Sequence, residues 1–145
     1  MDKEELSLLR QIAVGIARQF GNHCEVAIHD ISGNDPEHSI VYIENGYVSG
    51  RHIGDGMARV VLEQTIVRAH ESKASQEKTA DGRTLRTSMI YIRDHQDHML
   101  AILEISYDIS LLVAGTEAVQ EFAAARNGSA TDIPNKPFFE CGLPR

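Results

Sequence analysis

Short turn signals between apolar runs constrain the fold of this chain more than any other feature of its sequence. Asn45-Gly46 favours a two-residue hairpin turn, because both central positions of such a turn need positive φ. The polar run 94–97 joins two further apolar segments, and Asp81-Gly82 marks another turn. Turns this short join antiparallel neighbours, since parallel strands need a long crossover. The sequence therefore predicts strands over 24–31, 38–44, 47–49, 84–93 and 98–107, whereas residues 71–80 fit either a loop or a poor strand.

Three segments with helical periodicity accompany these strands. From Leu6 to Phe20, apolar residues recur at steps of three and four, and Gly21-Asn22 then stops the helix. A middle helix is predicted from Met57 to about His70. A last helix is predicted over 110–126, capped by Asp108 or Ser110, with an apolar face of Leu111, Leu112, Gly115, Ala118, Val119, Phe122 and Ala123. The order of elements predicts an α+β domain in which helices pack on one antiparallel sheet.

Composition narrows the class of protein. The 145 residues suit one domain, which we expect over 1–126, with a tail or linker over 127–145 that carries three of the four prolines. No apolar run is long enough to span a membrane. We expect no signal peptide, because the first residues lack a basic start and an apolar stretch. Cys24 and Cys141 lack metal or redox spacing, so we expect free thiols in a cytoplasmic protein. The net charge of −7 argues against nucleic-acid binding by this segment itself.

A set of short motifs resembles the YheO-like PAS domain, the sensor half of a group of bacterial transcriptional regulators. The matches span residues 20–108, about three-fifths of the chain, and they are specific jointly rather than singly. They are Phe20-Gly21, Cys24-Glu25-Val26, His29-Asp30, the run Pro36 to Ile40, Asn45-Gly46, Val48 to Arg51, Gly54-Asp55, Asp81 to Arg86, Ser88 and Ile92-Arg93-Asp94.

The resemblance implies a fold and a role. The fold would be a five-stranded antiparallel PAS-like sheet flanked by N-terminal, middle and C-terminal helices. The role would be that of a sensor module, which in this family is usually followed by a helix-turn-helix domain. No such domain fits after residue 126, so we expect contact with DNA only through a domain missing from this chain.

Eight polar side chains are candidate contacts for a small polar ligand. They are His29, Ser39, Tyr42, Arg51, Asp55, Arg86, Ser88 and Glu104. A neutral imidazole at the end of a buried strand offers one donor and one acceptor to a ligand. The alternative for His29 is a core histidine tied to Asp30 or Ser39, because buried polar groups are usually satisfied internally.

The other candidates carry similar alternatives. Arg86 and Ser88 alternate onto one strand face, and Glu104 lies on the predicted neighbour, so Arg86 either pairs with Glu104 or holds a ligand carboxylate. Arg51 and Asp55 lie in a glycine-punctuated stretch that, in the resembling fold, frames the mouth of the cavity. They could instead fix a turn. Tyr42 could line the pocket or simply pack.

Metal, cofactor and catalytic chemistry are not expected. His95-Gln96-Asp97-His98 has ligand-like spacing but no second pair of ligands nearby, and a structural zinc site needs four. Haem binding through His29, His38 or His70 has equally little support. No nucleophile elbow, phosphate loop or HExxH motif occurs in the sequence. We therefore expect a protein that is not an enzyme.

Two functions from different classes remain. The first is a dimeric sensor that binds a small polar metabolite, such as an amino acid, and signals through the helix at 110–126. We expect a twofold dimer formed through the wide apolar faces of the terminal helices. The second is a ligand-free dimerisation or docking module with a filled core. The two differ in whether His29, Arg86, Ser88 and Glu104 satisfy one another or surround a cavity.

Overall fold

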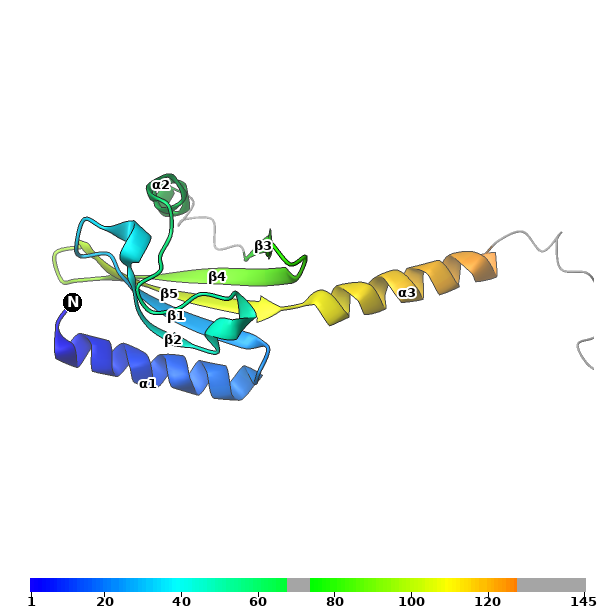
Figure 1. Ribbon diagram of the computed structural model, residues 1–145, viewed down its shortest axis with the longest axis horizontal. Helices are drawn as coiled ribbons and strands as arrows, with labels where there is room; N and C mark the ends of the chain where they lie inside the picture. The colour runs from blue at the N-terminus through cyan, green and yellow to red at the C-terminus, as the bar shows by residue number, and fades with distance from the viewer. Residues whose placement is uncertain (68–73, 128–145) are drawn as a thin grey trace, which may run out of the picture. The chain divides into compact units, whose positions relative to one another are not determined.

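One antiparallel sheet forms the centre of the protein. A computed structural model describes residues 1–67 and 74–127. Within these ranges five strands lie in the spatial order β2-β1-β5-β4-β3 (Figure 1). The α+β class and the five-stranded antiparallel sheet are confirmed. The strands are β1 Cys24–Asp30, β2 Ile40–Glu44, β3 Ser75–Lys78, β4 Thr84–Arg93 and β5 Met99–Asp108.

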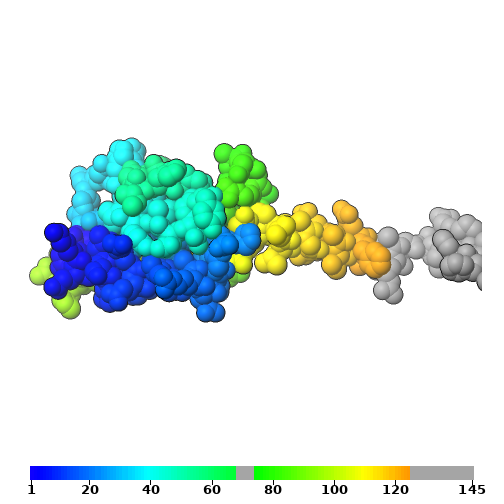
Figure 2. All heavy atoms as spheres, turned by 60° about the horizontal axis from the view of Figure 1, so that its bottom comes forward, coloured from blue at the N-terminus to red at the C-terminus, as the bar shows by residue number. Residues whose placement is uncertain are grey.

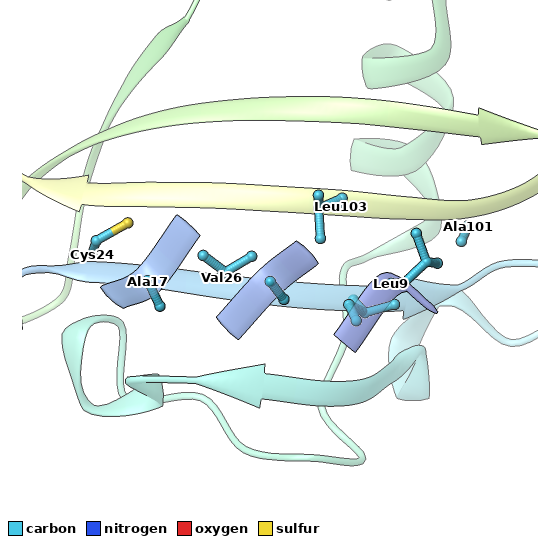
Figure 3. Close-up of a cluster of buried hydrophobic side chains, with 8 residues drawn as sticks. Leu9, Ala17, Cys24, Val26, Ala101 and Leu103 are labelled. Atoms are coloured by element: carbon cyan, nitrogen blue, oxygen red, sulfur yellow. The ribbon is translucent and has the colours of Figure 1, made fainter. Parts of the chain in front are cut away.

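Helix α1, Lys3–Phe20, covers one face of the sheet (Figure 1). Asp2 and Glu5 form a capping box at its start, and Gly21, with φ of 81°, ends it at the predicted stop. The buried side of α1 packs on the two central strands, β1 and β5 (Figure 3). This core consists of Leu9, Ala13, Ala17, Cys24, Val26, Ile28, Ala101 and Leu103.

The opposite face of the sheet carries the short elements of the chain. They are the 3-10 turns η1, Pro36–His38, and η2, Gly46–Val48, and the helix α2, Arg59–Val67. Figure 1 shows α1 and α2 on opposite sides of the sheet. The Tyr91 hydroxyl of β4 donates a hydrogen bond to the backbone oxygen of Thr65 at 3.0 Å, which ties α2 to the sheet. The chain between η2 and α2 therefore lies over the sheet face that α1 leaves free.

The predicted hairpin at Asn45-Gly46 and the strand over 47–49 are wrong. Asn45 is left-handed, with φ of 54°, but Gly46 does not have the positive φ that the hairpin turn requires. The Asn45 amide donates to the Cys24 carbonyl oxygen at 2.8 Å and so anchors the turn to β1. A Cβ atom on Gly46 would lie 2.5 Å from the Arg51 carbonyl oxygen, so the chain folds back closely here. The result is the turn η2 in place of a strand.

The remaining elements agree with the sequence more closely. Residues 75–78 form strand β3, which decides the open choice for 71–80 in favour of a strand as far as residues 74–80 are described. Helix α3, Ser110–Asn127, begins where the Asp108 carboxylate accepts a hydrogen bond from the Ser110 backbone at 3.0 Å. The predicted helix end at His70, Cys141 and nearly all of the predicted tail lie outside the described residues.

Helix α3 leaves most of its apolar face exposed. The chain divides into two compact units, Met1–Leu111 and the part from Leu112 onward, to which most of α3 belongs. The exposed fractions of its large apolar side chains range from 65% to 78%, for Leu111, Leu112, Val119 and Phe122. No described helix is both long and apolar enough to cross a membrane.

Candidate functional site

The face of β1 and β5 that points away from α1 is unusually polar for the interior of a sheet. Glu25 lies opposite Ser106 and Ala27 lies opposite Glu104, so these positions share one face of the sheet. His29 belongs to the same face, because it lies two residues after Ala27 and four residues after Glu25 in β1. The side chains of Glu25, His29 and Glu104 are 0–4% exposed. Buried charged groups of this kind need partners close by.

Arg51 supplies the first of these partners. Its Nη2 donates to Glu25 at 2.7 Å, while Nη1 and Nη2 donate to the two oxygens of Glu104 at 3.1 and 2.9 Å. The Arg51 Nε donates to the Ser49 hydroxyl at 3.1 Å, which helps to orient the guanidinium. This two-pronged contact matches the planar fork of arginine to a carboxylate. One arginine from the η2–α2 connection thus joins β1 to β5.

His29 supplies the second partner. Its Nε2 lies 2.8 Å from Glu104 Oε2, and its Nδ1 lies 2.8 Å from the Ser39 hydroxyl. Ser39 donates its only proton to the Pro36 carbonyl oxygen at 2.8 Å, so toward His29 it can only accept. The Glu104 carboxylate likewise offers only acceptors, so both ring nitrogens of His29 lie beside oxygen acceptors.

The protonation of Glu104 follows from these contacts. Burial by itself raises the pKa of this carboxyl, but the hydrogen bond from His29 and the charge of Arg51 outweigh burial and hold the pKa at about 2. Burial also opposes the charge on Arg51, yet Glu104 and Glu25 more than compensate and raise the pKa of the guanidinium. Glu104 and Arg51 therefore favour each other's charged forms within the cluster.

No polar atom of this network is left without a partner. Among the described residues, every buried side-chain nitrogen or oxygen has a hydrogen-bond partner. Thr87 and Ser106 close the network on the β4 side, with their hydroxyl oxygens 3.0 Å apart. The site is thus a filled ionic cluster, and its hydrogen bonds hold together β1, β5 and the segment that leads to α2.

Arg51 is the one member of the cluster with a substantial exposed surface, 24% of its side chain. It borders an open groove of about 480 Å³ that is lined by β2, by η2 and by the segment that follows η2. The apolar walls of this groove are Ile43, Tyr47 and Ile53, and His52 lies beside them. A small molecule in this groove would reach Arg51 before any other charge of the cluster.

Four of the eight predicted site residues meet in this cluster: His29, Ser39, Arg51 and Glu104. For His29, the structure shows the tie to Ser39 that the sequence left as an alternative. Asp55 is exposed, and its carboxylate accepts from the His52 backbone at 2.8 Å, which is the expected alternative of a turn residue. Ligand contact by any of these residues stays a prediction.

The other predicted residues lie elsewhere, and the expected Arg86–Glu104 pair is wrong. From Leu85 to Ile92, each even-numbered residue of β4 lies opposite an odd-numbered residue of β5 and the reverse, so Arg86 faces Tyr107 and Glu104 faces Met89. Arg86 and Ser88 are exposed and lie on the α1 side of the sheet. The sequence showed the alternation within each strand but not the register between them.

Tyr42 also lies on the α1 side of the sheet. It is opposite Ile28, which belongs to the core under α1. Its hydroxyl donates to Glu44, and the Arg10 guanidinium lies 4.6 Å from its ring centroid. Burial, followed by the neighbouring Glu44, raises the pKa of the phenol. Tyr42 is therefore a packing residue with a polar tip and is separated from the cluster by the sheet.

Glu25 is the site residue that sequence reasoning missed. It is 1% exposed, binds Arg51, and also accepts a hydrogen bond from the Ser49 backbone at 2.9 Å. A signal was present, because Glu25 is a charged residue near the start of a buried strand and lies four residues before His29, on the same face. Among residues 1–67 and 74–127, no three His, Cys, Asp or Glu side chains are placed to hold a metal ion.

Comparison with known proteins gives a consistent picture. The family model of the YheO-like PAS domain matches residues 1–124. The transcriptional regulator DauR of Pseudomonas aeruginosa is 30% identical over 113 residues, 78% of this chain and 51% of DauR. The protein YheO of Escherichia coli K12 is 25% identical over 117 residues, 76% of this chain and 48% of YheO. The chain thus spans about half the length of these relatives.

A solved structure shows the same fold. An RNA-binding light-oxygen-voltage receptor aligns over 84% of this chain and 39% of its own, with a TM-score of 0.50 and 12% identity. At this level of identity the likeness concerns the fold alone.

Proposed function

Since this chain belongs to the YheO-like PAS domain family, we propose that it is the ligand-sensing and dimerisation domain of a bacterial transcriptional regulator. It is related to a transcriptional regulator, and the matched region makes up 51% of that protein. On this proposal the protein acts in the cytoplasm, performs no catalysis, and reaches DNA through a helix-turn-helix domain elsewhere in the regulator. The signal would be a small polar metabolite.

The observation that carries the sensing role is the position of Arg51. It holds the two buried carboxylates of Glu25 and Glu104 and also borders the groove of about 480 Å³. Breaking a buried ion pair by removing one partner costs about 3–5 kcal/mol, because an uncompensated charge remains buried. A metabolite that enters the groove and exchanges contacts with Arg51 therefore acts on the connection that leads to α2. The metabolite would bind the domain with the Arg51 contacts intact and the domain with these contacts broken with different affinities, and this difference would provide the signal.

The output would pass through α3. This helix follows directly after the central strand β5, which carries Glu104. Its exposed apolar side chains would be buried against a second copy of the chain in a twofold dimer. A shift of β5 would then alter the position of paired α3 helices and of the DNA-binding domains that follow them.

The second candidate is a ligand-free dimerisation or docking module. The observation that favours it is the complete hydrogen bonding of the cluster, since no buried polar atom among the described residues calls for a ligand. In that case the cluster would serve only to fix β1, β5 and the η2 segment in one arrangement.

Thermal unfolding in the presence of candidate metabolites separates the two functions. The panel contains amino acids, organic acids and nucleobases, and a ligand of the native state raises the midpoint with its concentration. On the sensor proposal one compound raises the midpoint saturably. Arg51→Lys weakens the binding that causes this shift at least about tenfold, because the two-pronged geometry is lost. The exposed control Arg86→Lys retains the shift. No shift with any compound, from a folded and dimeric protein, would support the ligand-free module.

A further inference from the structure

All three basic residues of helix α1 lie along one face of the helix. They are Lys3, Arg10 and Arg18, spaced by seven and eight residues. At 3.6 residues per turn and 1.5 Å per residue, these spacings place them about two turns, or about 10–12 Å, apart and within an arc of about 80°. The side chains of all three are exposed. The chain as a whole has a net charge of −7, so this basic face stands out against its surroundings.

No salt bridge joins the basic face to a carboxylate within the described part of the fold. Within residues 1–67 and 74–127, side-chain carboxylates lie within 4.0 Å of Arg51, Arg83 and Arg93. In the same ranges, no carboxylate lies that close to any of the three basic residues of α1. Arg10 is held in place over the ring of Tyr42, which donates its own hydroxyl to Glu44. Arg10 is thus held by its contact with Tyr42, while its side chain remains exposed.

Arg10 and Arg18 of α1 border one groove. It has a volume of about 420 Å³ and is bordered by Arg10, Val14, Gly15, Arg18 and, from β2, Tyr42. In Figure 2 the dark-blue α1 lies against the segment that contains β2, and the two elements are in contact. Ser7 and Gln11 complete the lining of the groove, which therefore combines polar and apolar side chains with the positive charges of two arginines.

Gly15 keeps this groove open without serving the fold. It lies inside α1, where glycine costs roughly 1 kcal/mol relative to alanine. Its φ is not positive, and no heavy atom lies within 4 Å of the place where a Cβ would stand. Neither backbone conformation nor close packing therefore requires glycine at this position. The visible effect of the missing side chain is the open floor of the groove.

We propose that the basic face of α1 binds a short acidic segment of another polypeptide. From Lys3 to Arg18 the face is about 22 Å long, which an extended segment of about seven residues would span. Carboxylates of such a segment would pair with the three basic side chains, and its backbone would pass over Val14 and Gly15. This surface lies on the far side of the sheet from Arg51, so the proposal is independent of the proposed metabolite site.

Binding of a fluorescein-labelled heptaglutamate peptide to the whole chain tests the proposal. Fluorescence anisotropy gives the affinity for the wild type, for the double variant Arg10→Glu/Arg18→Glu, for Gly15→Leu and for the control Arg86→Glu. The control reverses the charge of one exposed arginine on β4, as each half of the double variant does on α1. We expect the double variant to weaken binding about tenfold or more, because several exposed ion pairs are reversed. Gly15→Leu should weaken it too, by filling the groove, while Arg86→Glu should not.

Several outcomes would overturn the proposal. One is no binding of the peptide by the folded wild type at about 0.05 M salt, where exposed charges are least screened. Another is equal weakening by Arg86→Glu, which would mean non-specific attraction. Equally tight binding of a labelled oligothymidylate would indicate a general polyanion surface. Self-association that depends on salt and is lost in the double variant would assign the face to a second copy of the chain. Circular dichroism verifies that Gly15→Leu, a change that favours helix, remains folded.

Discussion

Arg51 is the residue on which the buried charges of this domain converge. It holds Glu25 and Glu104 from the solvent side, while His29 holds Glu104 from the interior. Each of these side chains would be costly to bury alone. Because Glu25 and Glu104 share one guanidinium, the loss of any of these three groups should cost far more than the loss of an exposed ion pair, for which about 0–1 kcal/mol is usual.

Replacement of Glu104 by glutamine should destabilise the protein strongly. The change removes the carboxylate that both Arg51 and His29 contact, and it leaves Glu25 as the one carboxylate of the cluster that holds the Arg51 guanidinium. We expect a loss of about 3 kcal/mol in the free energy of unfolding, measured by urea denaturation. Glu77→Gln, at an exposed position of β3, is the matched control and should change stability by less than about 0.5 kcal/mol. A loss for Glu104→Gln as small as that of the control would contradict this account of the cluster.

Acid should remove the contribution of Glu104. The pKa of this carboxyl is lowered from 4.5 to about 2 by its partners in the folded state. A group with a depressed folded pKa stabilises the native state above its unfolded pKa, and this contribution disappears as the pH falls to the folded value. The difference in unfolding free energy between wild type and Glu104→Gln should therefore shrink between about pH 4.5 and about pH 2. A difference that is constant over this range would show that ionised Glu104 does not stabilise the fold.

At the scale of elements, the two terminal helices behave differently although both carry wide apolar faces. Helix α1 buries Leu9, Ala13 and Ala17 on the sheet. In α3 the apolar residues Leu112, Val119 and Phe122 remain exposed. A contiguous apolar face on a helix is costly to expose to water, which is why we propose that α3 contacts a second copy of the chain.

Polar substitutions on α3 should therefore separate the dimer without unfolding the protein. Val119 and Phe122 are 68% and 70% exposed, so replacing both with serine removes no contact inside the core. We expect light scattering to report the mass of a dimer for the wild type and of a monomer for the double variant. Glu121→Ser, on the polar side of the same helix, should leave the mass unchanged. A monomeric wild type at high concentration would remove the proposal of a dimer.

At the scale of the whole molecule, stability is concentrated in the middle of the sheet. Strands β1 and β5 each have neighbours on both sides, and the core under α1 and the ionic cluster lie on their two faces. Strand β3 is exposed along its length, and α2 has no buried residue. Local opening should therefore begin at β3 and α2 and reach β1 and β5 last.

Native-state hydrogen exchange measures this order directly. Backbone amides of β1 and β5 should exchange only by global unfolding, while those of β3 and α2 should exchange through local opening of much lower free energy. Amides in α2 that are protected as well as those in β5 would contradict the expectation and would indicate that α2 is held by contacts stronger than the Tyr91–Thr65 hydrogen bond.

Local patterns were sufficient for most of the fold. The stripe from Leu6 to Phe20, the apolar strands and the turn at Asp81-Gly82 each depend on residues close together in the chain, and these elements lie where they were predicted. The failure at 47–49 came from Asn45, whose amide binds the distant Cys24 carbonyl. A contact over 21 residues has no signature in the turn motif itself.

The candidate site also combines features that depend on local sequence with features that depend on long-range contacts. The sequence by itself determined which residues were chemically suited to a buried polar site, since His29, Ser39, Arg51 and Glu104 all belong to it. Only the tertiary structure decided their partners. The register between β4 and β5 moved Arg86 away from Glu104, and the fold of the η2–α2 connection brought Arg51 in its place. The physical reason is that alternation within a strand is a local property, whereas register and loop position depend on how the whole chain packs.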